Sequence, residues 1–268
     1  MSPPTDATVD RAPAIDPRIR ERRVAIQRSR GRRRLYWLIG VVAVVALVIG
    51  VVGLLHTSWF DARVVTVTGA HPHTTTGAIE AAAGLARHPP LIDVDTGAAA
   101  RRVEGLPFIA TARVSLHWPD GVAIAVTERV PVAQVAGPGT SWSVLDGFGR
   151  TLEVQPQQVP GLPVFAVHTS TGPVRPAPVG QRLPPAAADG LLVARTLPKA
   201  FSGQVVALTV AADDTVTLAL NSGITVDLGT ATALAAKYED VAAILARGSL
   251  QATSVIDVTV PSSPTVGP

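Results

Sequence analysis

The longest apolar run in the chain covers residues 35–55, which are 21 residues without a single charged side chain. At about 1.5 Å of rise per residue, a helix of this length reaches about 30 Å, the thickness of a bilayer's hydrocarbon core. The run is too long for the apolar part of a signal peptide, and no small-x-small cleavage pair follows it in His56–Phe60. Aromatic pairs at both ends, Tyr36-Trp37 and Trp59-Phe60, suit the two membrane interfaces. We predict a single, uncleaved transmembrane helix over 35–55.

The pattern then changes to a period of two, interrupted by two helical stretches, over residues 60–130. The turn Pro119-Asp120-Gly121 joins two strongly alternating segments, so we predict a hairpin there, with Leu116 and Trp118 on its buried face. Asp95 is expected to be the N-cap of the second helix, and Pro107 to end it. The predicted order is β-α-α-β-β: a strand at 65–68, a helix through 79–86, a helix from 95 to 106, and strands at 112–118 and 122–126.

Residues 131–268 read as a second, mostly antiparallel β domain with a late helix. Asp213-Asp214 and Asn221–Gly223 are predicted turns, and Gly248 is predicted to end the late helix. The proline-rich segment 154–185 is expected to form a loop or extended layer, and its path cannot be assigned. The other predicted elements are a helix at 185–197, strands at 206–210, 216–220 and 224–228, a helix around 234–245, and a closing strand at 254–260. The fold class is therefore α+β, behind a basic tail and one membrane helix.

Charge predicts the orientation of the anchor. Residues 1–34 hold ten arginines and four acids, a net charge of +6, whereas the rest of the chain has a net charge of −3. By the positive-inside rule the 1–34 tail is cytoplasmic and the C-terminal domains are extracytoplasmic. Nine arginines beside a membrane entry point also favour contact with anionic lipids. No aromatic residues interleave with them, so nucleic-acid binding is not expected. The first 17 residues, rich in proline and poor in large apolar side chains, are predicted to be disordered.

No residue pattern supports catalysis. The chain has no cysteine, which excludes disulfides as well as a thiol nucleophile, and it lacks the common nucleophile, phosphate-loop and zinc-protease motifs. A zinc site at His71, His73 and His88 is disfavoured because no ordered carboxylate pair accompanies these loop histidines. We therefore expect no cofactor, no metal and no small-molecule substrate. Trp118 and Trp142 are expected to pack in the core or between domains.

The Glu128-Arg129 pair is the most informative charged feature. Neighbours on a strand point to opposite faces, so the two side chains cannot bond each other. We expect them to tie the 60–130 unit to the domain that follows, although an exposed pair is the alternative.

Several of these segments together resemble one protein family. Val65–Gly69, Leu106–Val114, Trp118-Pro119 and the Glu128-Arg129-Val130-Pro131-Val132-Ala133 stretch are similar to the POTRA domain of the bacterial FtsQ/DivIB division proteins. The second domain continues the resemblance over most of its length, which brings the total to about residues 20–266. The chain departs from the family at Thr259, where members often carry Arg, and in its short tail after Val266. The further segments that carry the resemblance are Ser143–Arg150, Gly161–Val164, Leu228-Gly229 with Lys237, and Ile256–Val258.

The resemblance implies a membrane-anchored scaffold of the division machinery at the septum, with no enzyme activity. It also implies that the edge of the closing strand captures a segment of an FtsB-like protein coiled with an FtsL-like one, by strand addition. Three alternatives stay open: an extracytoplasmic cell-wall enzyme, a POTRA-type secretion chaperone, and a closing segment that is merely a frayed terminus. The implied partner-binding residues are Val258, Thr259, Val260, Pro261, Ser262, Ser263, Pro264 and Thr265.

Overall fold

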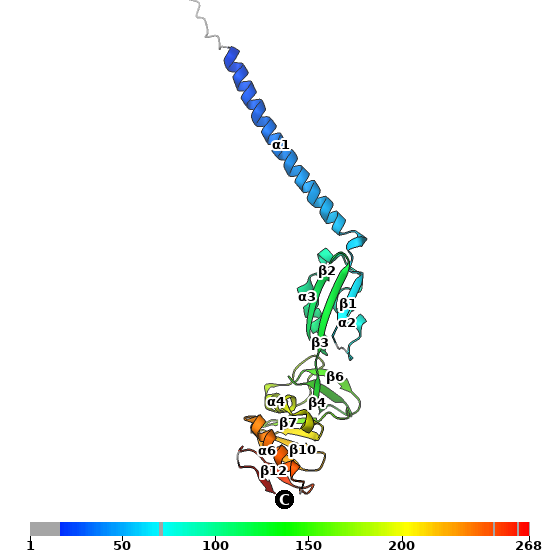
Figure 1. Cartoon of the computed structure of the whole chain (residues 1–268), viewed down its shortest axis with the longest axis vertical. Coiled ribbons are helices and arrows are strands. Elements are labelled where there is room, and N and C mark those ends of the chain that lie inside the picture. The colour runs from blue at the N-terminus through cyan, green and yellow to red at the C-terminus, as the bar shows by residue number, and fades with distance from the viewer. Residues whose placement is uncertain (1–16, 70–71, 249, 262, 268) are drawn as a thin grey trace, which may run out of the picture. The chain divides into compact units, whose positions relative to one another are not determined.

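The structure is a computed structural model that describes residues 17–69, 72–248, 250–261 and 263–267. It divides into two units, residues 1–60 and 61–268. The first unit is dominated by one long helix, α1, Pro17–Leu55, followed by a short 3-10 turn at Ser58–Phe60 (Figure 1). Residues 33–55 of α1 are long and apolar enough to cross a membrane. The helix begins well before the predicted span because Pro17 suits a first helical position and the Arg, Ala, Gln and Glu residues that follow favour helix. The predicted disorder of residues 1–16 lies outside the described residues.

A small α+β unit follows from residue 61. Its sheet has the order β1-β3-β2, with β1 (Val64–Thr68) parallel to β3 (Gly121–Glu128) and β2 (Ile109–His117) antiparallel to β3. Helices α2 (Thr76–Ala83) and α3 (Thr96–Glu104), with a 3-10 turn at Leu91–Asp93, bury their apolar faces against one side of this sheet. The predicted β-α-α-β-β order is confirmed.

The second helix begins where the sequence indicated, whereas the two helices end at Ala83 and Glu104, before the predicted residues 86 and 106. The side chain of Asp95 accepts a hydrogen bond from the N–H of Ala98 at 2.9 Å, as expected for an N-cap, and this bond lowers the pKa of the carboxyl. Thr75 caps α2 through the N–H of Ala78, and Gly84 ends that helix in the left-handed conformation.

The second domain is built on one long, twisted sheet with the order β13-β12-β11-β10-β9-β7-β4-β5-β6, while short β8 pairs with β7. Most neighbours are antiparallel, and the parallel pairs are β4 with β7, β7 with β9, and β11 with β12. The strands are β4 (Pro131–Ala136), β5 (Trp142–Asp146), β6 (Thr151–Gln155), β7 (Val164–Thr169), β8 (Gly172–Pro173), β9 (Val205–Val210), β10 (Val216–Leu220), β11 (Thr225–Gly229), β12 (Val255–Asp257) and β13 (Thr265–Gly267).

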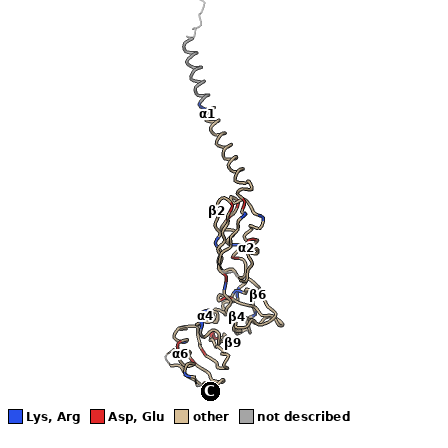
Figure 2. Tube along the Cα trace, turned by 45° about the vertical axis from the view of Figure 1, so that its right-hand side comes forward, with Lys and Arg blue, Asp and Glu red and all other residues tan. Residues whose placement is uncertain are grey.

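Helices α4 (Ala188–Thr196), α5 (Lys199–Ser202) and α6 (Leu234–Ala246), with a 3-10 turn at Pro185–Ala187, cover this sheet. Gly190 lets α4 approach closely, because a Cβ built there would lie 2.4 Å from both Phe165 and Val210. Glycine lowers helix propensity, but packing requires it at this position. Along the described part of residues 61–267, acidic and basic positions are interspersed on the chain trace (Figure 2).

The proline-rich segment 154–185, whose path could not be assigned from the sequence, contains the interior strand β7. Two other features differ from the sequence-based expectations. Trp118 is 53% exposed and is not a core residue, because it lies beyond the end of β2, where strand alternation no longer applies. The closing strand β12 is shorter than predicted, since the chain bends at Thr259 and Val260.

The central strand of the small sheet gives a direct stability prediction. Ile124 in β3 is fully buried, whereas Val64 in β1 is 55% exposed, and both lose a β-branched side chain on replacement by alanine. We expect Ile124→Ala to lower the free energy of unfolding by about 2–5 kcal/mol. Val64→Ala should change it by no more than about 0.5 kcal/mol. Denaturant unfolding of the two variants measures both values, and equal effects would mean that the buried face is wrongly assigned.

Candidate functional site

The candidate site is the end of the larger sheet formed by the last residues of the chain. Strand β12 lies parallel to β11, with Ile256 opposite Val226, and β13 lies antiparallel on the other side of β12 (Figure 1, C-terminal strand in red). The outer side of β12 is therefore covered by the chain's own β13. The outward backbone groups of β12 are therefore paired within the chain.

The backbone bonds determine which groups of β12 face outward. The N–H of Thr225 donates to the carbonyl of Ser254 at 3.1 Å, and the N–H of Val258 donates to the carbonyl of Asp227 at 2.9 Å. Because alternate residues of a strand bond to opposite neighbours, Ile256 also faces β11. Val255 and Asp257 consequently direct their N–H and C=O groups away from β11. Their partners on that side are Gly267 and Thr265 of β13.

The outer edge of β13 offers little to a further strand. Thr265 and Gly267 face β12, so Val266 alone among the described residues of β13 directs its backbone groups outward. Pro264 and Pro268, two residues before and after Val266, have no N–H. An edge of this kind resists unselective pairing.

The residues predicted to bind a partner do not form a continuous strand. Val258 is fully buried and bonded to β11, Thr259 and Val260 lie in a bend, and Pro261 lies in a turn. Ser262 lies outside the described residues. The N–H of Ser263 donates to the carbonyl of Val260, Pro264 follows, and Thr265 opens β13. The segment is thus a tight reversal that brings β13 back onto β12.

Asp257 stabilises the start of this reversal. Its Oδ1 accepts a hydrogen bond from the N–H of Thr259 at 2.8 Å, and this bond lowers the pKa of the carboxyl. If β12 continued, Thr259 would be the next residue after Val255 and Asp257 to direct its N–H away from β11. This N–H is instead bonded to the Asp257 side chain.

A buried lysine fixes α6 to the end of β11. Lys237 is 1% exposed, and its Nζ donates to the carbonyls of Leu228 at 2.7 Å and Thr230 at 2.8 Å. Desolvation lowers the pKa of this ammonium group. From the sequence, Lys237 was recognised only as part of a family pattern. Its burial could have been inferred because it is a single lysine among Leu234, Tyr238 and Val241 on the apolar side of a helix.

A buried ion pair joins the small unit to the larger sheet. Nη1 of Arg129 donates to Oδ2 of Asp146 at 2.8 Å, and the other carboxylate oxygen accepts the N–H groups of Phe148 and Arg150. Arg129 also donates through Nε to the carbonyl of Ile109 in β2. This part of the prediction for the Glu128-Arg129 pair is confirmed.

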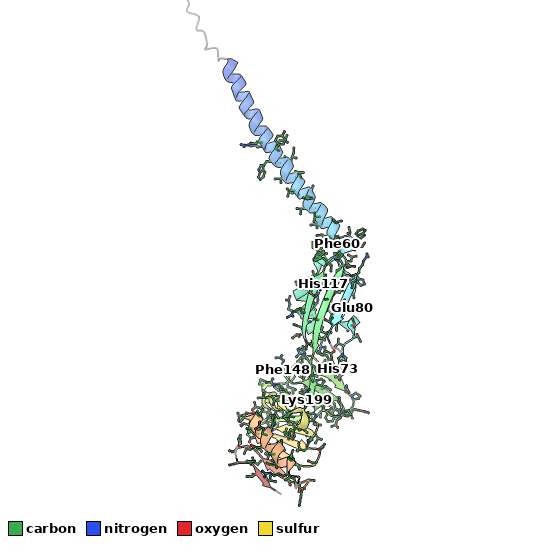
Figure 3. All side chains as sticks on the ribbon, in the orientation of Figure 1. Phe60, His73, Glu80, His117, Phe148 and Lys199 are labelled. Carbon is green, nitrogen blue, oxygen red and sulfur yellow. The ribbon has the colours of Figure 1, made fainter. Side chains whose placement is uncertain are left out.

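Glu128 acts within the small unit instead. Its carboxylate accepts hydrogen bonds from Nδ1 of His73 at 3.0 Å and from the His73 N–H, while the His73 ring stacks on Phe108 with centroids 4.6 Å apart. The expectation that Glu128 also reaches the next domain is therefore wrong. His73 and His117 lie at opposite ends of the three-stranded sheet (Figure 3).

The described residues contain no group of three or more His, Cys, Asp or Glu side chains placed to hold a metal ion. His73 is engaged with Glu128, His88 donates through Nδ1 to the carbonyl of Ala62, and His71 lies outside the described residues. The groove between α4 and α6 is lined mainly by apolar side chains, with Glu239 as its one acid. It brings together no pair of acid and base groups.

Comparison with known proteins identifies the family. Residues 60–129 match the POTRA domain, FtsQ-type, and residues 133–259 match the cell division protein FtsQ/DivIB C-terminal domain. The cell division protein FtsQ of Streptomyces bingchenggensis is 32% identical over 90% of this chain and 89% of its own length. This chain belongs to the FtsQ/DivIB family. The FtsQ proteins of Mycobacteroides abscessus (30% identity over 96% of this chain and 81% of the relative) and Streptomyces collinus (31% over 87% and 89%) are also similar.

The family match places the end of the sheet in a shared part of the molecule. The matched C-terminal domain includes β11, β12 and Lys237 but stops at residue 259, before β13 begins. The edge of β12 is thus part of the FtsQ/DivIB fold, whereas the strand that covers it lies beyond the matched residues.

The ion pair between the small α+β unit and the larger sheet should be critical for stability. Arg129→Ala leaves Asp146 buried without its charged partner, so we expect a loss of about 3–5 kcal/mol in the free energy of unfolding. Asp146→Ala should lower stability further, because two backbone N–H groups also lose their acceptor. Arg113→Ala, on the exposed face of β2, is the control. Calorimetric midpoints that do not separate Arg129→Ala from Arg113→Ala would contradict this role.

Lys237 gives a second stability prediction. Lys237→Met keeps the apolar stem and removes the ammonium group, so the Leu228 and Thr230 carbonyls lose a donor. We expect a loss of about 1–3 kcal/mol in the free energy of unfolding. Lys199→Met, at an exposed position of α5, should change it little. Chemical denaturation of both variants tests the difference, and an unchanged stability of Lys237→Met would show that water or other donors replace the bonds.

Proposed function

We propose that this chain is a membrane-anchored, non-enzymatic scaffold of the bacterial division machinery. Its membership of the FtsQ/DivIB family is the observation that carries the proposal. The scaffold role is further supported by the chemistry of residues 61–267, where several charged and polar side chains are committed to structural bonds. Arg129 with Asp146, Lys237 with two carbonyls, and His73 with Glu128 each have their partners within the fold.

The anchor is α1, with the tail of residues 1–34 in the cytoplasm and the residues from about 56 onward outside it. The charge asymmetry supports this orientation, since ten of the chain's arginines precede the apolar run. The same arginines would contact anionic lipid headgroups at the cytoplasmic surface. The scaffold would act at the division septum, where its extracytoplasmic part meets other membrane proteins of the division machinery.

The proposed partner is an FtsB/FtsL-like pair, held by strand addition at the end of the larger sheet. Backbone pairing is a recurrent way for a sheet edge to take up an extended peptide. The geometry of the sheet favours Val255 and Asp257 as the residues that pair with the added strand, because their N–H and C=O groups point away from β11. The originally predicted residues 258–265 then act as the reversal beside the added strand rather than as the strand it pairs with.

Val255→Pro tests this proposal in the full chain. Proline removes the outward N–H of Val255, while the groups of Ile256 that bond β11 remain. We expect the variant to reach the membrane and fold, yet to lose co-purification with the FtsB/FtsL-like pair. The control is Val255→Thr, which keeps the β-branched shape and the N–H. Capture of the pair by Val255→Pro at the level of Val255→Thr would contradict strand addition at β12.

A further inference from the structure

Strand β13 holds its place on β12 with few contacts. It has three residues, and none of them is buried: Val266 is 47% exposed, Thr265 is exposed and Gly267 is half-buried. Its attachment therefore depends mainly on backbone bonds from Thr265 and Gly267 to the outward groups of Asp257 and Val255. Short segments without buried side chains open more easily than the core strands that they cover.

The position that β13 occupies is also the best strand-binding position at this end of the sheet. Val255 and Asp257 each present one N–H donor and one C=O acceptor to a strand in this position. The outer side of β13 presents a single donor, the N–H of Val266, because the prolines two residues before and after it have none. A partner strand can thus form a regular ladder with β12 but not with β13. The partner strand and β13 would therefore compete for the same backbone groups of Val255 and Asp257.

The opposite end of the sheet is covered at the first residue of β6, by a different kind of segment. The backbone of Thr151 at the start of β6 is already bonded to the segment that passes beside it: its N–H donates to the carbonyl of Gln181, and its carbonyl accepts the N–H of Gly180. The loop that supplies these bonds continues into the buried Leu183 and is part of the core packing. Of the two ends, only the β12 end is covered by a segment without buried side chains.

We propose that β13 is a displaceable cover, and that a partner strand binds by taking its place on β12. The inference rests on the proposed function, because it concerns how the partner site is opened. The partner segment must be extended, must carry an N–H at the two positions opposite Val255 and Asp257, and must place an apolar side chain where Val266 now lies opposite Ile256.

The absence of cysteine from the chain allows a clean test. In the full-length protein, Val255→Cys with Gly267→Cys places two thiols at directly opposed positions, which lie at a separation that a disulfide can span. A Cβ added at Gly267 has no atom within 4 Å, so the substitution is accommodated. Oxidation then fixes β13 on β12, and reduction releases it in the same molecule. A truncation that removes residues 264–268 leaves the position permanently open.

The probe is the FtsB/FtsL-like pair added to the detergent-solubilised full chain. We expect the oxidised double-cysteine protein to lose binding and the reduced form to regain it. The truncated chain should bind more tightly than the unaltered chain, by the inverse of the fraction of molecules in which β13 is open; if about one molecule in ten is open, Kd falls about tenfold. Equal binding by the oxidised and reduced forms would overturn the inference while leaving the proposed function intact. No binding by any form, including the truncated one, would contradict the proposed function and remove the basis of the inference.

Val266→Pro excludes the competing geometry. It removes the outward N–H of β13 and leaves the bonds of Thr265 and Gly267 to β12 in place. Binding of the pair should be no weaker than in the unaltered chain. Loss of binding in this variant would show that the partner pairs with the outer side of β13, and the cover would not be displaced.

Discussion

The last strand of an open sheet must find partners for the backbone groups on its outer side, and the C-terminal half of this molecule is arranged around that constraint. Alternate residues of β12 bond inward to β11, so a complete donor and acceptor pair at Val255 and another at Asp257 remain on the outer side. The chain reverses through a bend, and β13 then pairs with Val255 and Asp257. The prolines on either side of β13 have no N–H, which limits the pairing of any further strand with the sheet.

Buried polar contacts hold this end of the molecule to the rest. Lys237 attaches α6 to the carbonyls that follow β11, and the Arg129–Asp146 pair joins the small α+β unit to the first hairpin of the larger sheet. Breaking one side of a buried pair is expensive because the other side stays desolvated. The two contacts therefore stiffen the part of the molecule that carries the β12 edge.

Local sequence signals predicted much of the fold. The apolar run of α1, the Asp95 cap, the hairpin at Pro119–Gly121 and the strands β9 to β11 all follow from periodicity and turn chemistry within short windows. The interior strand β7 was missed because the surrounding prolines dominate the window, although Phe165 and Val167 alternate correctly.

Other features depend on contacts between distant residues. Gly190 lowers helix propensity, yet it is needed where α4 meets Phe165 and Val210. The ion pair of Asp146 could not be predicted from nearby residues, because its partner Arg129 follows the last strand of the small unit. The cover by β13 could not be predicted either, since nothing in a three-residue segment between prolines specifies which strand it will join.

Residue-resolved hydrogen exchange of the full chain, with and without the FtsB/FtsL-like pair, measures directly whether a partner strand replaces β13 on β12. In the free protein the amides of Val255 and Asp257 should exchange faster than that of Ile256, which bonds to β11. We expect the pair to slow exchange at Val255 and Asp257, to speed it at Thr265 and Gly267, and to leave Ile256 unchanged. Slower exchange at β6 or β2, with no change at Val255 and Asp257, would contradict this expectation.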